Sequence, residues 1–471
     1  MTDPATKIKF GTDGWRAVIA REYTFANVER VAQAYADYLK KSSASRIVIV
    51  GYDRRFLSEK FAACAAEVMA GNSFEPLFFG EDVPTPFISW AVHELGAAGG
   101  IVITASHNSA NFNGFKIKAP FGGSASPEMT SAVEALLDSN APVRSTVNNS
   151  GSDLLTSSFE SYRHKIETYV DIETLRATRA RVVIDPIHGV GGRWVESFLS
   201  GSIIEAETIR AERDPLFGGV NPEPIDQNLG ALKQKVKESG ALIGLATDGD
   251  ADRVGAVDDL GNTMTMLQVV PLLLLHLVRH RQMTGGVVRT FSQSVLLKKI
   301  AEKFNLKLHL TPIGFKYIAD LMINDDILIG AEESGGIGVK GHIPERDGIL
   351  NSLLLLEAVV ASGKRPSEMV EDMHKEFGEF HFGRKDLHVD TVEHGTSVVA
   401  ELKDSPPDKI AGFKLQSIET LDGLKLLFED ESWLLFRQSG TEPVLRIYSE
   451  ATSVKKMNGF LDAGAKIVLD V

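Results

Sequence analysis

A strand–helix–strand pattern that recurs three times constrains this chain of 471 residues more than any other feature of its sequence. In each copy a short β-branched run leads through a polar loop into an amphipathic helical stretch. Each copy closes with an apolar strand that runs directly into a polar motif. Alternating strands and helices are typical of α/β layers with mostly parallel sheets. Ligands bind beyond the carboxyl ends of such strands, which is where all three polar motifs fall.

The three copies predict three related α/β domains. Their opening strands are expected at 46–50, 181–184 and 286–290, and their closing strands at 100–104, 241–246 and 327–330. From about Gly378 onward, the stretches 425–428 and 433–436 predict antiparallel strands before a last helix at 454–468. We therefore expect a smaller α+β domain at the C-terminus. Polar stretches and turn signals divide the chain into domains at 1–150, 151–258, 259–377 and 378–471.

The composition excludes several classes of function. Fifty Lys and Arg residues stand against 63 Asp and Glu residues, and the formal net charge of −13 argues against a nucleic-acid or anionic-membrane surface. A single cysteine, Cys64, excludes an intramolecular disulfide and a cysteine-rich metal site. The N-terminus lacks a signal-peptide pattern, and the apolar run 269–275 is too short to span a membrane. We expect a cytoplasmic protein.

The run 248–253 (DGDADR) directly follows a predicted strand. It places carboxylates at alternate positions, Asp248, Asp250 and Asp252, where they can converge on one hard divalent cation. An EF-hand is excluded, because its loop needs Gly at the sixth position and Glu at the twelfth, where this chain has Arg253 and Asp259. An acidic surface turn is the alternative interpretation.

The run 104–108 (TASHN) places Ser106 on an expected exposed turn just past a buried strand. His107 beside it does not make a Ser–His dyad, because adjacent side chains usually diverge and no Gly-x-Ser-x-Gly elbow is present. Lys116 and Lys118 follow closely. Cations stabilise anionic groups and a lysine with a lowered pKa can move protons, so the segment favours phosphate chemistry over acyl transfer. A purely structural turn is the alternative.

Three further segments are candidates for binding a polar ligand. The turn 437–443 (RQSGTEP), with Arg446 beyond it, offers backbone N–H groups and a guanidinium to an anion, or is an unliganded hairpin turn. The run 11–16 (GTDGWR) is a weaker candidate of the same kind. Glu332 and Ser334 can exchange hydrogen bonds with hydroxyl groups, or form a turn at the start of a helix.

In order and spacing, these motifs resemble those of the α-D-phosphohexomutase superfamily over essentially the whole chain. The resemblance implies three related α/β domains and a C-terminal domain similar to the TATA-binding protein, around a central cleft. It implies a mutase that interconverts hexose 1-phosphate and hexose 6-phosphate through a phosphoserine and a hexose 1,6-bisphosphate. It further implies a sugar phosphate as substrate, Mg²⁺ as cofactor, no nucleic-acid or membrane partner, and a monomer or homodimer.

The resemblance also implies roles for single residues. The phosphoserine, which contacts the metal as well, falls on Ser106, and the Mg²⁺ ligands fall on Asp248, Asp250 and Asp252. Positions implied in proton transfer and phosphate binding are Arg16, His107, Lys116, Lys316 and His342. Positions implied in holding the sugar and its distal phosphate are Glu332, Ser334, Arg437, Ser439, Gly440 and Thr441, and we expect Arg446, beyond the turn, to bind substrate with them.

Two features bear on the details of the reaction. Ser109 stands where many members have proline, so a second serine lies three residues beyond Ser106. The sugar loop 332–334 (EES), together with 342–347 (HIPERD), is more similar to phosphoglucomutases than to glucosamine-type or dual-specificity enzymes. We therefore expect glucose phosphates, with a phosphomannomutase or a dual-specificity enzyme as the alternative. A metal-dependent sugar phosphatase and a non-catalytic sugar-phosphate-binding protein are the more distant alternatives.

Overall fold

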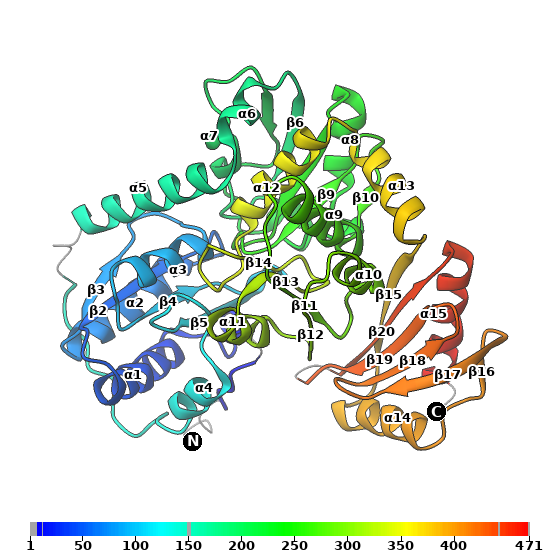
Figure 1. Cartoon of the computed structure of the whole chain (residues 1–471). Coiled ribbons are helices and arrows are strands. Elements are labelled where there is room, and N and C mark those ends of the chain that lie inside the picture. Colours follow the sequence, from blue (N-terminus) through cyan, green and yellow to red (C-terminus); the bar gives the residue numbers. More distant parts are fainter. Residues whose placement is uncertain (1–6, 12, 148–151, 441–442, 470–471) are drawn as a thin grey trace. The chain divides into compact units, whose positions relative to one another are not determined.

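The computed structural model describes residues 7–11, 13–147, 152–440 and 443–469 (Figure 1). The chain divides into two compact units, each with its own hydrophobic core. The first unit comprises Met1–Met264, Ile318–Asp325 and Ser334–Ser367. The second unit comprises Thr265–Tyr317, Asp326–Glu333 and Glu368–Val471.

The first unit contains a five-stranded sheet in the order β1-β5-β4-β2-β3. Its strands are β1 (Trp15–Val18), β2 (Ile47–Tyr52), β3 (Glu75–Phe78), β4 (Gly99–Ile103) and β5 (Phe112–Lys118). Its helices are α1 (Phe25–Ser42), α2 (Ser58–Gly71), α3 (Thr85–Glu94) and α4 (Pro127–Glu134). β2 pairs in parallel with β3 and β4, whereas β5 is antiparallel to β4 and β1. The segment between β4 and β5 is therefore a hairpin loop, and it carries Ser106.

Burial explains why the strands of this sheet were visible as continuous apolar runs. β4 is buried along its whole length and β2 along nearly all of it, because helices such as α2 and α3 pack against the sheet (Figure 1). Helix α1 begins at Phe25 because the Thr24 side chain accepts a hydrogen bond from the Asn27 N–H, which caps the helix.

A second five-stranded sheet of this unit has the order β10-β9-β8-β6-β7. Its strands are β6 (Arg181–Asp185), β7 (Glu205–Thr208), β8 (Ile243–Thr247), β9 (Val254–Val257) and β10 (Thr263–Met264). The helices along this part of the chain are α5 (Ser152–Tyr169), which packs against α3, and α6 (Ile172–Ala177), α7 (Trp194–Phe198) and α8 (Gly230–Ser239). β6 is parallel to β7 and β8, whereas β9 is antiparallel to β8 and β10. The loop between β8 and β9 holds the three aspartates.

Two later elements also belong to the first unit. They are β14 (Ile337–Val339) and α12 (Gly348–Ser362). Helix α12 packs against β8 and β9, and Asp347 caps its start by accepting hydrogen bonds from the N–H groups of Ile349 and Leu350. Asp347 and the start of α12 are therefore held next to the sheet whose β8–β9 loop carries the three aspartates.

The second unit contains three strands that pair in parallel and, separately, an antiparallel sheet. β11 (Gly286–Thr290) pairs in parallel with β12 (Leu308–Thr311) and β13 (Ile327–Ala331). The helices along this part of the chain are α9 (Met266–Arg279), α10 (Val295–Lys303) and α13 (Pro366–Phe377), together with α11 (Phe315–Asn324), which from Ile318 onward belongs to the first unit. The Ser294 side chain caps α10 by accepting a hydrogen bond from the Leu296 N–H.

The C-terminal sheet is antiparallel and has the order β15-β20-β19-β18-β17-β16. Its strands are β15 (His381–His388), β16 (Lys409–Ile410), β17 (Phe413–Glu419), β18 (Leu424–Phe428), β19 (Trp433–Gln438) and β20 (Val444–Ala451). Helices α14 (Val392–Asp404) and α15 (Val454–Leu469) pack on this sheet (Figure 1). In β19, Leu434 and Phe436 join the core under these helices, whereas Trp433 and Leu435 join a cluster with Phe291. Both faces are buried, which explains the unbroken apolar run.

The expected fold class is confirmed: the chain has three α/β domains and a C-terminal domain built on an antiparallel sheet. The expected strands lie within about two residues of the observed ones. The antiparallel strands β5, β9 and β10 were not predicted, because Asn113 and Gly114 interrupt the pattern of β5 and because β9 and β10 have only four and two residues. No helix among the residues that the structure describes is long and apolar enough to cross a membrane.

Candidate active site

Ser106 begins the loop that follows β4, and its backbone is left-handed, with φ at +51°. Its N–H donates to Thr104 Oγ1 at 2.9 Å, and its hydroxyl donates to Asp248 Oδ2 at 2.8 Å. The expectation of an exposed turn is wrong, because Ser106 is only 1% exposed. The 248–253 loop covers it so closely that a Cβ on Gly249 would lie 2.4 Å from the Ser106 carbonyl oxygen.

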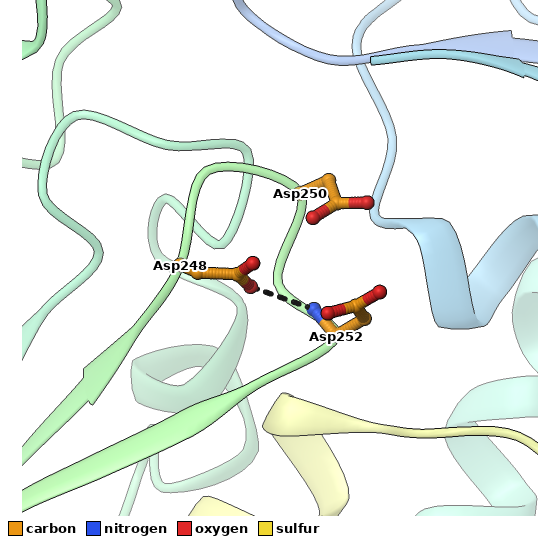
Figure 2. Close-up of side chains that lie close together, drawn as sticks. All are labelled: Asp248, Asp250 and Asp252. Atoms are coloured by element: carbon orange, nitrogen blue, oxygen red, sulfur yellow. Dashed lines mark hydrogen bonds between the residues drawn. The ribbon is translucent and has the colours of Figure 1, made fainter. Parts of the chain in front are cut away.

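Asp248, Asp250 and Asp252 lie on one loop between β8 and β9, and Figure 2 shows their three carboxylates around it. They are fully buried, and one oxygen of each lies within 4.8 Å of the others. Asp248 Oδ1 accepts hydrogen bonds from the N–H groups of Asp252 and Arg253, both at 3.0 Å, which closes the loop around this carboxylate. The interpretation as an acidic surface turn is therefore wrong, because a surface turn would be solvated.

Lys116, on β5, is buried among carboxylates. Its Nζ lies 2.8 Å from Asp13 Oδ2, 2.8 Å from Asp250 Oδ2 and 3.1 Å from Asp252 Oδ2. Burial by itself disfavours the ammonium, but these three carboxylates outweigh it and raise the pKa of Lys116 above its usual value. The expectation of a lysine with a lowered pKa is thus wrong. In this arrangement Lys116 is a fixed cation.

The negative charge of Asp248, Asp250 and Asp252 can accommodate a further cation. Burial, together with Asp252 and Asp250, raises the pKa of Asp248 well above its usual value. Burial acts in the same direction on Asp250, but Lys116 and the Thr85 hydroxyl hold the pKa of Asp250 below its usual value. Within the described ranges, Asp250 Oδ1 and Asp252 Oδ1 are buried and accept no hydrogen bond. Three converging aspartates, two of which have an orphaned carboxylate oxygen, fit Mg²⁺, a hard cation that prefers oxygen ligands.

The other predicted groups of the first unit differ in their surroundings. Arg16 Nη1 donates to Asn108 Oδ1 at 2.7 Å, so it lies against the Ser106 loop. His107 Nδ1 is 3.4 Å from Ser106 Oγ, a long contact beside the 2.8 Å bond from Ser106 to Asp248. His342 is buried elsewhere, with its ring stacked on Trp90 and its Nε2 3.0 Å from Asp347 Oδ2.

Sequence reasoning assigned no role to several residues that complete this cluster. Asp13 pairs with Lys116 and Arg346, and Arg346 Nη2 also lies 2.9 Å from Asp252 Oδ2. Both residues fell inside segments that the sequence had singled out, 11–16 and 342–347. Thr85 donates its hydroxyl to Asp250 Oδ2 at 2.7 Å, and nothing in the sequence pointed to it. The two are 165 residues apart, so only packing brings them together.

The predicted substrate-binding residues lie mainly in the second unit. Glu332 is buried at the end of β13, and Glu333 accepts a hydrogen bond from the Ser292 hydroxyl. Lys316 Nζ lies 5.2 Å from the centre of the Tyr317 ring. Ser334, half-buried, is the one member of this set that belongs to the first unit.

The predicted phosphate loop follows β19. Arg437 Nε donates to Asp422 Oδ1 at 3.0 Å; burial opposes the guanidinium charge, but Asp422 raises the pKa of Arg437 overall. The N–H of Ser439 donates to the Val444 carbonyl oxygen at 2.9 Å, which closes the turn, and Arg446 Nε lies 3.9 Å from Asp386 Oδ2. A Cβ on Gly440 would meet no atom within 4 Å. Thr441 lies outside the described residues.

Models of the four phosphoglucomutase/phosphomannomutase domains match the chain in order. The alpha/beta/alpha domains I, II and III match residues 7–144, 160–261 and 268–377, and the C-terminal domain matches residues 393–467. The chain belongs to the phosphoglucomutase/phosphomannomutase family. It is therefore an intramolecular phosphotransferase, a phosphohexomutase, and the resemblance to the α-D-phosphohexomutase superfamily is confirmed.

Individual phosphohexomutases resemble this one along nearly their whole length. A phosphoglucomutase/phosphomannomutase of Thermococcus kodakarensis is 32% identical over 460 residues, 98% of each chain. A phosphoglucosamine/phosphogalactosamine mutase of Sulfurisphaera tokodaii is 29% identical over 467 residues, again 98% of each. The crystal structure of a Thermus thermophilus protein, provisionally assigned as a phosphomannomutase, aligns with a TM-score of 0.87 at 36% identity and covers 98% of this chain and 99% of that one. Family membership thus identifies the reaction class and not the hexose.

Proposed function

We propose that this phosphohexomutase interconverts glucose 1-phosphate and glucose 6-phosphate, with phosphorylated Ser106 as the phosphoryl donor. The observation that carries the proposal is the 2.8 Å contact between Ser106 Oγ and Asp248 Oδ2. It joins the hydroxyl on one loop to the buried aspartate triad on another, 142 residues away. A phosphorylated oxygen at that position would lie at the one described group of three carboxylates that can share a metal ion.

Two transfers of opposite direction make up the proposed reaction. In the first, the free hydroxyl oxygen of the sugar phosphate forms a bond to phosphorus while the bond from phosphorus to Ser106 Oγ breaks. The hydroxyl proton passes to Ser106 Oγ, and the sugar becomes a hexose 1,6-bisphosphate. In the second, Ser106 Oγ takes the other phosphoryl group and its proton passes to the released sugar oxygen. His107 Nδ1, 3.4 Å from Ser106 Oγ, is proposed to carry these protons.

The buried charges of the first unit suit this transfer. Mg²⁺ bound by Asp248, Asp250, Asp252 and an oxygen of phosphorylated Ser106 would offset the charge on the moving phosphoryl group. Lys116, fixed as a cation, is proposed to hold a phosphoryl oxygen, and Arg16 acts beside it on the Ser106 loop. His342 is proposed to support phosphate binding, although its Nε2 is engaged with Asp347 in this structure.

The sugar and its non-reacting phosphate are proposed to bind through the remaining predicted residues. Glu332 and Ser334 would exchange hydrogen bonds with sugar hydroxyls in both orientations of the bisphosphate. The proposed phosphate contacts are Lys316, Arg437, Ser439, Gly440, Thr441 and Arg446. Support comes from Arg437, whose guanidinium is oriented by Asp422 through Nε and which can offer its Nη donors to an anion.

The preference for glucose rests on the loop sequence Glu332-Glu333-Ser334, with mannose and dual specificity as the alternatives. The test is an assay of glucose, mannose and glucosamine 1-phosphates, each with Mg²⁺ and a catalytic amount of the matching 1,6-bisphosphate. The proposal expects the highest kcat/KM for glucose 1-phosphate. Inorganic phosphate as the main product, without isomerised sugar, would instead indicate a phosphatase. We further propose a cytoplasmic monomer or homodimer, which fractionation and sedimentation velocity would check.

A further inference from the structure

Arg55, in the turn between β2 and α2, is a buried guanidinium that the proposed reaction does not use. Its side chain is fully buried, among the largest of the fully buried side chains described. Burying a guanidinium is unfavourable unless every donor finds an acceptor. The partners of Arg55 therefore show what the burial of this charge achieves.

All five N–H donors of Arg55 are used, and four of them reach residues 106–112, that is, the Ser106 loop with the first residue of β5. Nη2 donates to the carbonyl oxygens of Ser106 and Asn108, both at 2.6 Å. Nη1 donates to the carbonyl oxygens of Ser109 and Phe112, at 2.8 and 3.0 Å. The fifth donor, Nε, lies 3.1 Å from Asp53 Oδ2. A guanidinium has five donors in one plane, so this set is complete.

Asp53 connects Arg55 to the other backbone group of Ser106. Its Oδ2 also accepts the Thr104 hydroxyl at 2.6 Å, and Thr104 Oγ1 in turn accepts the Ser106 N–H at 2.9 Å. Arg55 binds the carbonyl oxygen of Ser106, and Thr104 binds its N–H. Both Arg55 and Thr104 donate to the Asp53 carboxylate. The ring of Phe217 lies 5.0 Å from the guanidinium carbon and supports it from another side.

The conformation of Ser106 explains why such support is needed. A φ of +51° is uncommon for a residue with a Cβ, and it persists only where the surroundings hold it. From that backbone the hydroxyl reaches Asp248. A shift of the loop by about 1 Å is enough to cost a transfer reaction roughly 100-fold in rate.

We infer that Arg55 is the positioning residue that holds the Ser106 loop in its reactive geometry, by binding four of its carbonyl oxygens at once. The inference rests on the proposed role of Ser106 as the phosphoryl donor. The hydrogen bond from Arg55 to Ser106 goes to its backbone carbonyl oxygen, so Arg55 acts on the orientation of the nucleophile and not on the sugar. A lysine would keep the charge, but its three donors on one atom cannot serve four carbonyls in a plane.

The test is Arg55→Lys, compared with Arg54→Lys as a matched control. Arg54 is the neighbouring residue and donates to Asp82 and to the Ala211 carbonyl oxygen instead. For Arg55→Lys we expect kcat to fall about 100-fold, while KM for the sugar phosphate stays within about threefold of the wild-type value. The rate at which Ser106 gains phosphate from hexose 1,6-bisphosphate, followed by intact mass, should fall in parallel. Hydrogen exchange should accelerate in residues 105–112, and Arg54→Lys should change none of these values.

A folded Arg55→Lys enzyme with the wild-type kcat, or with a raised KM and an unchanged kcat, would overturn the inference. If Arg55→Lys does not fold, Asp53→Asn replaces it, since this variant keeps the guanidinium and the side-chain shape but removes the charge and one of the two oxygens that accept from Arg55, Ser58 and Thr104. It should show the same selective loss of kcat to a smaller degree, and an unchanged kcat would again overturn the inference. Ser106→Ala separates the two proposals: if that variant remains active, the donor is misassigned, whatever Arg55 does.

Discussion

Lys116 in the first unit and Lys425 in the second are both buried, but their pKa values move in opposite directions. Three carboxylates lie within 3.1 Å of Lys116 Nζ, and together they outweigh burial and raise its pKa. Lys425 Nζ donates to the Phe291 carbonyl oxygen and lies 4.1 Å from the centre of the Trp433 ring. Burial, with Arg289 acting in the same direction, lowers the pKa of Lys425 to about 7.

The difference shows that burial alone does not identify a functional cation. Lys116 is surrounded by more negative charge than it can neutralise, which leaves orphaned carboxylate oxygens in its cluster. Lys425 lies among aromatic rings, and two carboxylates, Glu450 and Glu419, act on it too weakly to offset burial; Glu450 already accepts hydrogen bonds from the Ser294 and Trp433 side chains. The first cluster has orphaned carboxylate oxygens that a cation can use, whereas the Glu450 carboxylate of the second cluster is already hydrogen-bonded. We therefore expect substitutions in the first cluster to affect catalysis and substitutions in the second to affect stability.

The largest effect is expected for Ser106→Ala. Removal of the proposed donor should lower mutase activity by more than about 10⁴-fold, as for other enzymes that lose their nucleophile. Because the hydroxyl is buried and donates to Asp248, the free energy of unfolding should also fall, by about 1 kcal/mol. A coupled assay and thermal unfolding measure the two effects. Ser109→Ala, whose exposed hydroxyl bonds only locally to Asn111, is the control, and phosphate found on Ser109 would contradict the assignment.

The second-largest effect on turnover is expected for substitution of an aspartate in the predicted metal site. Asp250→Asn replaces a charged oxygen ligand with a neutral one, so we expect turnover to fall at least about 100-fold and half-saturation by Mg²⁺ to shift upward. Chelation should abolish wild-type turnover and added Mg²⁺ should restore it. Asp226→Asn, at an exposed aspartate paired with Lys233, should leave the Mg²⁺ titration unchanged. Full activity after exhaustive removal of divalent ions would refute the metal role.

A smaller effect is expected for Arg437→Ala in the second unit. Loss of a charge-assisted phosphate contact of roughly 1.5–3 kcal/mol should weaken sugar-phosphate binding by about 10- to 150-fold and lower kcat as well. Phosphate on Ser106 and bound metal should be unchanged, because neither uses this loop. Calorimetry, intact mass and metal analysis measure the three quantities. Arg279→Ala, at another second-unit arginine paired with a carboxylate, is the control, and normal substrate affinity of Arg437→Ala would exclude the phosphate role.

The smallest effect on activity is expected for Lys425, and its comparison with Lys116 tests the two lysines directly. Lys425 binds a proton less readily in the folded than in the unfolded chain, so between about pH 7 and pH 10 the unfolded state holds more protons and stability rises with pH. The slope from this one group is at most about 1.4 kcal/mol per pH unit. Lys425→Met should remove this slope and retain activity, whereas Lys116→Met should lose activity. Denaturant unfolding at pH 7 and pH 9 measures how the free energy of unfolding changes with pH. The same change in Lys425→Met as in the wild type would refute the contrast between Lys425 and Lys116.

Local patterns in the chain were sufficient for the fold class and for much of the candidate site. Strand and helix periodicity predicted the α/β layers, because the faces that each element buries repeat along the sequence. The aspartates of 248–253 could be grouped in advance, because residues so close in the chain cannot separate far in space. Ser106 was found for a similar reason, since it directly follows a recognisable strand.

Contacts between distant segments, and the burial that they create, were decided only by the tertiary structure. Asp13 and Thr85 join the aspartate cluster from more than 150 residues away, and the burial of Ser106 depends on the approach of Gly249. The direction of the pKa shift of Lys116 depends on the same contacts, since a lysine responds to the charges that packing places around it. The role of Arg55 could be recognised only from the tertiary structure. Its four acceptors are backbone carbonyl oxygens, which every residue has, so no sequence pattern identifies them.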